Sequence, residues 1–423
     1  MKTSIKFVIV FFLCVAQSFA VVALATWWVN PYSLYREVES DPQAAVWLSK
    51  QLRLAKGFYA RALKPQGIAL GASTSQLAID VDHPGWNADA QPRYNLSFPG
   101  AYMYENLRYY QHARALAPVK QILLGLDFVA FNIFAPLSDD YRDAMIAADA
   151  NGAPRKDDFH VNAVALVSLD AVTASQKKAL AGKRGTHYSN GREIPEETEE
   201  RRWRSAMLGS ATGFITRLLL PPPAHRFCLE DANGDNPNFE YLETLLKTAQ
   251  ADGADLRLYI QPAHATLLEA LAELGYLETY MDWERKLTAL VERVNASASD
   301  STPIPLWDFS AYSAFTAETL PQDEATPMQW YWDVGHYKKE LGDRVQDRVF
   351  GYVSPERPGL ESFGARLTGA TIESHLASLL DKQKRYRKAN ATDLEELKAR
   401  IKDIEQNLPA FDCKALNAKN QPR

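Results

Sequence analysis

Two short motifs carry the side chains in this sequence that are best suited to nucleophilic chemistry. The first, Gly71-Ala72-Ser73-Thr74-Ser75, directly follows an apolar segment typical of a buried strand. A serine on a tight turn between a strand and a helix has its hydroxyl at the open end of a sheet, where small neighbours let backbone N–H groups approach a substrate oxyanion. Ser73 is therefore a candidate nucleophile. The alternative is that these hydroxyls only cap the next helix.

The second motif is Trp332-Asp333-Val334-Gly335-His336-Tyr337, which precedes a helical stretch. An aspartate three residues before a histidine can turn back and accept the imidazole Nδ1–H, which leaves Nε2 to act as a general base. Ser73, His336 and Asp333 would then form a catalytic triad. The alternative is a helix-capping aspartate beside a surface histidine. The aromatic residues 330–332 could stack on a sugar ring or belong to the core.

Two other segments contain side chains of functional types. His264 closes Gln261-Pro262-Ala263-His264 at the end of an expected strand, on the edge where a substrate would bind, and is a further site candidate. Asp80-Val81-Asp82-His83 is rich in metal-ligand types, but the Pro84-Gly85 that follows is typical of a turn. We therefore predict no metal site.

Positioning these motifs requires a sheet whose strands end beside them. Four short apolar runs end in polar or turn residues, as buried strands do: 66–71, 121–127, 256–261 and 304–309. Helical patterns lie between them, at 104–116, 241–251 and 265–294. This alternation predicts an α/β fold, a three-layer sandwich whose mostly parallel central sheet is covered by helices on both faces. Sites in such sheets lie at the carboxyl ends of the strands.

The chain divides into five predicted segments. They are an N-terminus (1–6), an apolar helix (7–29), a membrane-proximal segment (30–64), an α/β domain (65–355) and a helical tail (356–423). A polar stretch at about 135–235 interrupts the domain and is either a lid or partner surface, or an excursion without a role in chemistry. The tail contains an apolar stripe at helical spacing that docks on its own domain or, alternatively, mediates dimerisation. The stripe comprises Leu394, Leu397, Ile401, Ile404 and Leu408.

The composition excludes several classes of protein. With 46% hydrophobic and 23% charged residues in a chain of 423, general disorder is excluded. A formal charge of −5 without a basic stripe disfavours a nucleic-acid binder. Three cysteines are too few for a disulfide scaffold. In an exported body Cys228 and Cys413 could be bridged, or both could be unpaired thiols.

The N-terminal apolar segment is long enough to cross a bilayer. Residues 7–29 carry no charge and would form a helix of roughly 34 Å. Lys2 and Lys6 precede it, so the positive-inside rule predicts a cytoplasmic N-terminus and an exported body. The alternative is a signal peptide that is cleaved after Ser18-Phe19-Ala20.

Taken in order, the motifs resemble the blocks of the SGNH hydrolase superfamily. Ser73 matches the nucleophile of the first block, and the Asp-x-x-His motif matches the pair of the last block. Tyr94-Asn95-Leu96-Ser97-Phe98-Pro99-Gly100 resembles the second block. This resemblance implies that the Gly100 N–H helps to form an oxyanion hole and that Asn95 contributes to substrate binding.

Two positions depart from the family pattern. Gly125-Leu126-Asp127-Phe128 falls where the family has Gly-x-Asn-Asp, so Asp127 replaces a side-chain donor to the oxyanion. A carboxylate can donate only when it is protonated, and Asn132 is an alternative donor. Ala72 replaces the aspartate that usually precedes the nucleophile.

Together with the N-terminal anchor, the motifs are most similar to the membrane-tethered branch of this superfamily, which includes the D-alanyl transfer protein and the exported proteins of alginate-type O-acetylation. The resemblance implies a serine acyltransferase or esterase that acts on acyl esters of a cell-envelope polysaccharide, beside a multi-spanning membrane acyltransferase. It implies no metal or organic cofactor, and a single-pass protein of the bacterial inner membrane with an exported body. The alternative, which Ala72 and Asp127 favour, is a non-catalytic scaffold on the same fold.

Overall fold

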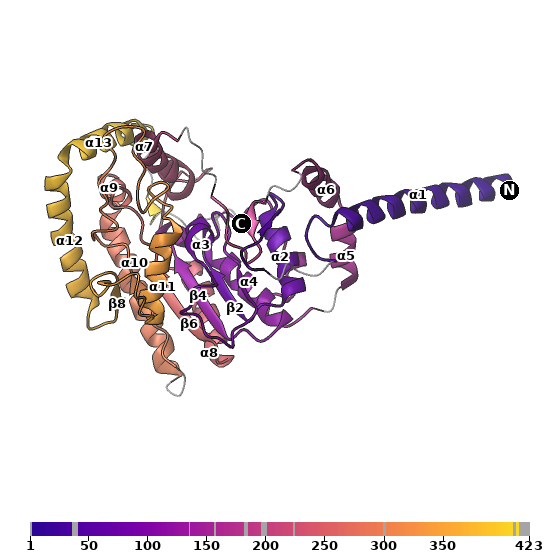
Figure 1. Ribbon diagram of the computed structural model, residues 1–423, viewed down its shortest axis with the longest axis horizontal. Helices are drawn as coiled ribbons and strands as arrows, with labels where there is room; N and C mark the ends of the chain where they lie inside the picture. Colours follow the sequence, from indigo (N-terminus) through magenta and orange to yellow (C-terminus); the bar gives the residue numbers. More distant parts are fainter. Residues whose placement is uncertain are drawn as a thin grey trace.

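A six-stranded sheet forms the centre of the fold (Figure 1). The computed structural model describes residues 2–35, 41–134, 136–155, 158–181, 185–195, 201–222, 225–298, 302–408 and 412–413. Within them the strand order is β3-β2-β4-β6-β7-β8, and all neighbours are parallel except β7 and β8. The predicted α/β class with a mostly parallel sheet is confirmed. The strands are β2 (Gly67–Leu70), β3 (Arg93–Asn95), β4 (Gln121–Leu126), β6 (Asp255–Ile260), β7 (Leu306–Asp308) and β8 (Ala365–Leu367).

The central strands form where the sequence is continuously apolar. Every residue of β2 and β4 is buried, as expected for strands covered on both faces. All four predicted strands are present, with boundaries that differ by no more than two residues. Strands β3 and β8 were not predicted, because each has three residues, one of them an arginine, and therefore no apolar run.

The helices around the sheet form two contacting groups. In one group α4 (Met103–Leu116) contacts α8 (Pro237–Ala251), which contacts α10 (Leu277–Ser297). In the other, α3 (Ser73–Ala78) contacts α11 (Lys339–Phe350). The single helix predicted over 265–294 is wrong. The chain forms α9 (Ala265–Glu273) and α10 instead, and Gly275 between them has a φ of 78°, a value that interrupts a helix and favours glycine.

Helix α11 packs closely on α3, and Gly342 is the residue that permits this approach. A Cβ atom at Gly342 would collide with the backbone carbonyl of Ala78. We expect Gly342→Ala to lower the free energy of unfolding by about 1–3 kcal/mol, because backbone atoms must move to relieve the overlap. Urea denaturation of the purified full chain measures this.

Gly209→Ala is the matched control for this prediction. Gly209 lies in α7 (Trp203–Phe214), and a Cβ there would meet no atom of the described residues within 4 Å. The control should be neutral or stabilising by up to about 1 kcal/mol, because alanine favours helix formation. Equal stability of the two variants would show that α11 does not depend on the close approach.

The inserted stretch around 135–235 packs against two different regions of the molecule. Helices α5 (Asp158–Val167) and α6 (Leu169–Ala181) contact α1 (Lys2–Val29), whereas α7 contacts α9 and continues into a π-helix, η3 (Ile215–Leu219). The remaining elements are β1 (Ala45–Val46), which pairs with β5 (His187–Tyr188), and α2 (Leu52–Leu63), η1 (Phe128–Phe131) and η2 (Asp143–Met145).

The C-terminal segment folds back onto the body. It contains α12 (Ile372–Ala389) and α13 (Ala391–Gln406), and α13 contacts α9. Leu394, Leu397 and Ile401 are buried there, so the prediction that this stripe docks on its own chain is confirmed for these residues. The domain boundary predicted at residue 355 is too early, since β8 lies beyond it and pairs with β7.

The two open alternatives about the cysteines are resolved in favour of a disulfide. Cys228 and Cys413 are bonded, with their Cα atoms 5.7 Å apart. The bond ties the C-terminal segment to the inserted stretch across 185 residues of sequence.

Helix α1 projects from one end of the body (Figure 1). Its span Ile5–Val29 is long and apolar enough to cross a membrane, and the most apolar part of it is not buried against the protein. The predicted apolar helix is therefore present.

Candidate active site

Ser73, Gly100, Asp127 and His336 come together where the strand order reverses. The chain runs from β2 outward to β3 and then returns to the other side of β2 as β4. Ser73 begins α3 just after β2, and Asp127 directly follows β4. Ligand sites of open α/β sheets occur at the carboxyl ends of strands at such a reversal. His336 reaches the same place from the loop before α11, because α11 packs on α3.

Ser73, His336 and Asp333 form a connected triad. The Oγ of Ser73 lies 2.8 Å from Nε2 of His336. Nδ1 of His336 lies 2.9 Å from each carboxylate oxygen of Asp333. The backbone N–H groups of Gly335 and His336 also donate to Asp333 Oδ1, both at 2.9 Å, so the carboxylate is held in a tight turn. Ser73 and His336 therefore lie within hydrogen-bond reach, as the predicted triad requires.

The charges around His336 favour its protonated form. Burial alone would lower its pKa, but the hydrogen bond and charge of Asp333, with the charges of Asp127 and Glu193, raise that pKa above its ordinary value. Burial would raise the pKa of Asp333, but the same histidine and two backbone donors lower it. Asp333 is therefore an ionised partner that stabilises the imidazolium formed when the histidine takes a proton.

A buried polar cluster beneath the triad links the serine turn to the histidine loop. Gln261 donates from Nε2 to Ser75 Oγ at 2.6 Å and accepts from the Tyr337 hydroxyl at 2.5 Å. The Tyr259 hydroxyl lies 3.0 Å from Ser75 Oγ. All four side chains are buried. Ser75 and Tyr337 are close neighbours in sequence of the triad residues, so this cluster fixes the nucleophile and the base relative to each other.

No pattern in the sequence predicts this cluster. Gln261 is an uncharged polar residue directly after β6, and that position is the one signal for its role, but the same segment also contains His264. His264 is fully buried and begins α9, where its Nε2 lies 2.7 Å from the Glu318 carbonyl and its Nδ1 accepts from the N–H of Thr266. Burial lowers its pKa to about 4. The prediction of His264 as a site residue is wrong, because its side chain caps a helix.

Two predicted asparagines also have structural positions. Asn95 is fully buried and donates to the backbone carbonyls of Ser75 and Ile79, both at 2.9 Å. Asn132 is fully buried and donates to the Arg226 carbonyl at 2.9 Å. Both side chains satisfy local backbone groups, as short amide side chains often do. The structure therefore contradicts a direct substrate contact for Asn95 and the proposed donor role of Asn132.

Backbone groups for an oxyanion are present on the wall of the same pocket. Ser73 and Gly100 both line it. Gly100 has a φ of 61°, and an added Cβ would meet no atom of the described residues within 4 Å, so the space beside its Cα is open. Ser73 is the first residue of α3, and N–H groups in a first helical turn have no acceptor within their helix.

Asp127 lines the pocket beside the triad but does not replace the missing asparagine. Burial in the pocket floor raises its pKa to about 6, although the His336 charge and a weak 3.4 Å hydrogen bond from Thr74 oppose the shift. At neutral pH most molecules therefore carry a carboxylate here, which accepts hydrogen bonds. The oxyanion must then depend on backbone donors.

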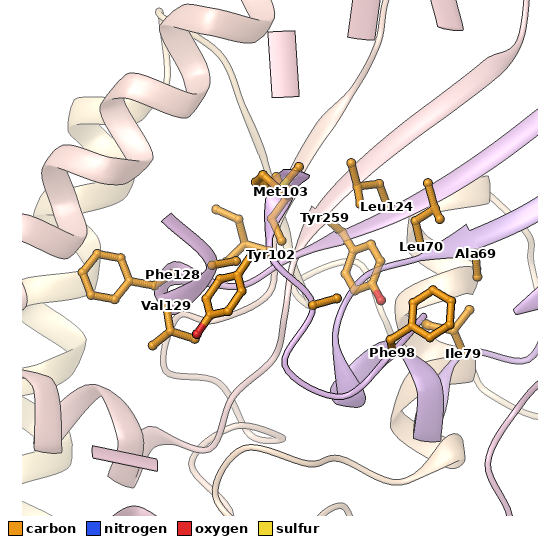
Figure 2. Close-up of a cluster of buried hydrophobic side chains, with 14 of the residues drawn as sticks. Ala69, Leu70, Ile79, Phe98, Tyr102, Met103, Leu124, Phe128, Val129 and Tyr259 are labelled. Atoms are coloured by element: carbon orange, nitrogen blue, oxygen red, sulfur yellow. The ribbon is translucent and has the colours of Figure 1, made fainter. Parts of the chain in front are cut away.

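The pocket next to Ser73 is mainly apolar and has a cavity volume of about 80 Å³. Figure 2 shows part of this wall, with Tyr102, Phe128 and Val129 grouped at the strand ends. Phe214 and Leu218 of the inserted stretch also line it, which supports the interpretation of this stretch as a lid over its interpretation as an excursion without a role. The deeper wall comes from α9 and α10 and from the turn after β7, through Leu267, Leu268, Leu271, Tyr280 and Ser310.

The aromatic residues before the triad loop divide between core and surface. Tyr331 is buried and donates its hydroxyl to the Pro262 carbonyl at 2.7 Å. Trp332 is half-buried and stacks on Trp203 at a ring distance of 6.2 Å, with the Lys338 ammonium 4.7 Å from its ring centre. A polar aromatic surface thus lies next to Asp333.

Comparison with protein-family models, curated proteins and solved structures finds no match for this chain. The geometry of the side chains is therefore the basis for a functional assignment. It provides a nucleophile, a base that is oriented by a carboxylate, and the backbone of Ser73 and Gly100 on the wall of an apolar pocket. These are the parts that acyl transfer through a serine requires.

Proposed function

We propose that this protein is a membrane-anchored serine acyltransferase or esterase of the SGNH hydrolase type. The observation that carries the proposal is the 2.8 Å contact between Ser73 and His336, with Asp333 2.9 Å behind the histidine. The position of the nucleophile after the first strand of the parallel sheet and the two separate groups of helices support the three-layer arrangement of that superfamily.

The proposed reaction has two steps. Ser73 Oγ attacks the ester carbonyl while His336 Nε2 takes the hydroxyl proton, and the proton then passes to the leaving alcohol as the acyl–serine ester forms. In the second step His336 takes a proton from water or from a sugar hydroxyl, which attacks the acyl–serine carbonyl. The acyl group leaves on that oxygen and the proton returns to Ser73. Backbone donors at Ser73 and Gly100 hold the oxyanion in both steps.

The pocket indicates the size and polarity of the acyl group. A cavity of about 80 Å³ with apolar walls suits a short acyl chain such as acetyl, which gains binding energy from burial rather than from charge.

The disulfide and the apolar helix α1 support a substrate in the cell envelope. The disulfide between Cys228 and Cys413 is typical of an oxidising compartment, outside the cytoplasm. Helix α1 would hold the body at the bacterial inner membrane, and its contacts with α5 and α6 keep the body close to the anchor. We therefore propose an acyl ester of a cell-envelope polysaccharide as substrate, and a multi-spanning membrane acyltransferase as the partner that supplies or receives the acyl group.

The pH dependence of ester hydrolysis tests this function. His336 must be neutral to accept the serine proton, and its pKa is raised, so the rate should increase with pH with a midpoint above about 6.5. Asp127→Asn removes a negative charge that raises this pKa and should move the midpoint to lower pH. The measurement is hydrolysis of p-nitrophenyl acetate between pH 5 and 9.

Asp323→Asn is the control, because it removes an exposed carboxylate on a loop outside the pocket and should leave the midpoint unchanged. A flat profile in the parent protein would contradict His336 as the base. Absence of hydrolysis at every pH would favour the non-catalytic scaffold, the alternative that the Asp127 carboxylate supports.

A further inference from the structure

Three side chains from distant parts of the sequence converge at a second place in the molecule. Glu284 comes from α10, Asp308 ends β7, and His375 comes from α12. Their ligand-type atoms all lie within 4.8 Å of one another. Glu284 and Asp308 are fully buried, and the His375 side chain is 11% exposed.

The polar atoms of this cluster face one another at ion-pair distances but outside hydrogen-bond geometry. Nε2 of His375 lies 2.9 Å from Asp308 Oδ2 and 3.8 Å from Glu284 Oε2. Among the described residues, neither oxygen of Glu284, nor Asp308 Oδ2, nor His375 Nε2 has a partner in hydrogen-bond geometry. Buried carboxylate oxygens that lack a hydrogen-bond donor, as both oxygens of Glu284 and Oδ2 of Asp308 do here, are costly unless a positive group binds them.

Neighbouring groups hold Asp308 in this orientation. Its other oxygen, Oδ1, accepts from the N–H of Ser310 at 2.7 Å and from the Ser310 hydroxyl at 2.6 Å. Oδ2 is therefore directed at His375 and Glu284. A pocket lined by Asp308, His375 and Lys382 lies beside the cluster.

We propose that Glu284, Asp308 and His375 bind a Zn²⁺ ion. One imidazole nitrogen and two carboxylate oxygens form a ligand set that zinc accepts, with bonds of about 2.0–2.2 Å. A tetrahedral site with such bonds separates its ligand atoms by about 3.3–3.6 Å. The two His375 distances, 2.9 and 3.8 Å, lie on either side of that value. Calcium and magnesium prefer ligand sets of oxygen atoms, which the histidine does not fit.

The ion would join the C-terminal segment to the core and to the acyl pocket. It would tie α12 to α10 and to the end of β7. The Ser310 hydroxyl also lies 2.6 Å from the Tyr280 hydroxyl, and both of these residues line the pocket beside Ser73. The metal site would thus fix the deep wall of that pocket. The inference does not depend on the proposed catalytic function.

Metal binding by the full chain tests the inference directly. The detergent-solubilised protein is freed of metal with a chelator and titrated with Zn²⁺ by calorimetry, and bound metal is counted by elemental analysis. We expect one equivalent at micromolar affinity or tighter. Co²⁺ in its place should give the visible absorption of a tetrahedral site. Glu284→Gln and His375→Gln should each weaken Zn²⁺ binding at least about tenfold, because each removes a ligand.

Two controls separate this site from other groups. Glu373→Gln changes an exposed carboxylate on α12, two residues before His375, and should bind as the parent does. His336→Ala tests adventitious binding at the triad and should also keep one equivalent. A proton on Glu284 is the competing way to neutralise the cluster, and the parent would then bind no Zn²⁺. That result, or unchanged affinity in folded Glu284→Gln, would overturn the inference.

Discussion

Replacing Ser73 with alanine is expected to lower the rate of ester hydrolysis by at least about 10³-fold, since removal of a triad nucleophile leaves only binding and oxyanion stabilisation. The Oγ atom is the group that His336 contacts at 2.8 Å. Its loss removes both the attacking atom and the acceptor of the acyl group. The rate is measured with p-nitrophenyl acetate at a pH above the midpoint of the parent profile.

Ser374→Ala is the matched control for the serine substitution, because Ser374 is an exposed residue of α12 whose hydroxyl donates to the Thr371 carbonyl of the same segment. Its rate should equal that of the parent. Both variants should unfold at the parent temperature, because Ser73 is only half-buried. A Ser73→Ala rate within a few-fold of the parent would show that another group performs the hydrolysis.

Asp333→Asn is expected to reduce the same rate by about 10⁴, the loss that this change causes in a serine protease triad. An asparagine oxygen can still accept from the N–H groups of Gly335 and His336, so the turn should remain folded. The amide cannot provide the negative charge that raises the histidine pKa, and it leaves the imidazole in the wrong tautomer.

The steady-state rate and the thermal unfolding temperature of Asp333→Asn must be read together. A large loss of rate with an unfolding temperature within a few degrees of the parent is the expected pattern. A rate within tenfold of the parent would mean that Asp333 only shapes the loop. If both the rate and the unfolding temperature fall, Asp333→Glu distinguishes the two explanations. This variant restores the negative charge and should recover part of the rate if the charge is what catalysis requires.

The sequence predicted the structure best where a feature is formed by residues that are only a few positions apart. Strands β2, β4, β6 and β7 are short apolar runs, and their boundaries followed from that pattern alone. Asp333 and His336 are three residues apart, so their contact belongs to one turn. The contact between Ser73 and His336 spans 263 residues, and only the resemblance to a known order of motifs connected them.

The contacts that the sequence did not predict depend on packing between segments that are distant in the chain. Tyr259, Gln261 and Tyr337 meet Ser75 because β6 and the histidine loop converge under α3, and no periodic pattern marks such a meeting. The group of Glu284, Asp308 and His375 is equally invisible, since two helices and a strand each supply one residue. His264 is the opposite case, a predicted site residue that is not one. It lies at a strand end, as substrate-binding residues often do, but its side chain caps helix α9.

Covalent labelling with a small fluorophosphonate tests the catalytic assignment most directly. Ser73 Oγ should displace fluoride from the phosphorus, with His336 taking the hydroxyl proton, and give one adduct per chain. Intact mass and peptide mapping should place that adduct on Ser73, and His336→Ala should label at least about 10³-fold more slowly. An adduct on another residue, or none on the folded parent while a known serine hydrolase in the same tube is labelled fully, would contradict a Ser73–His336–Asp333 triad.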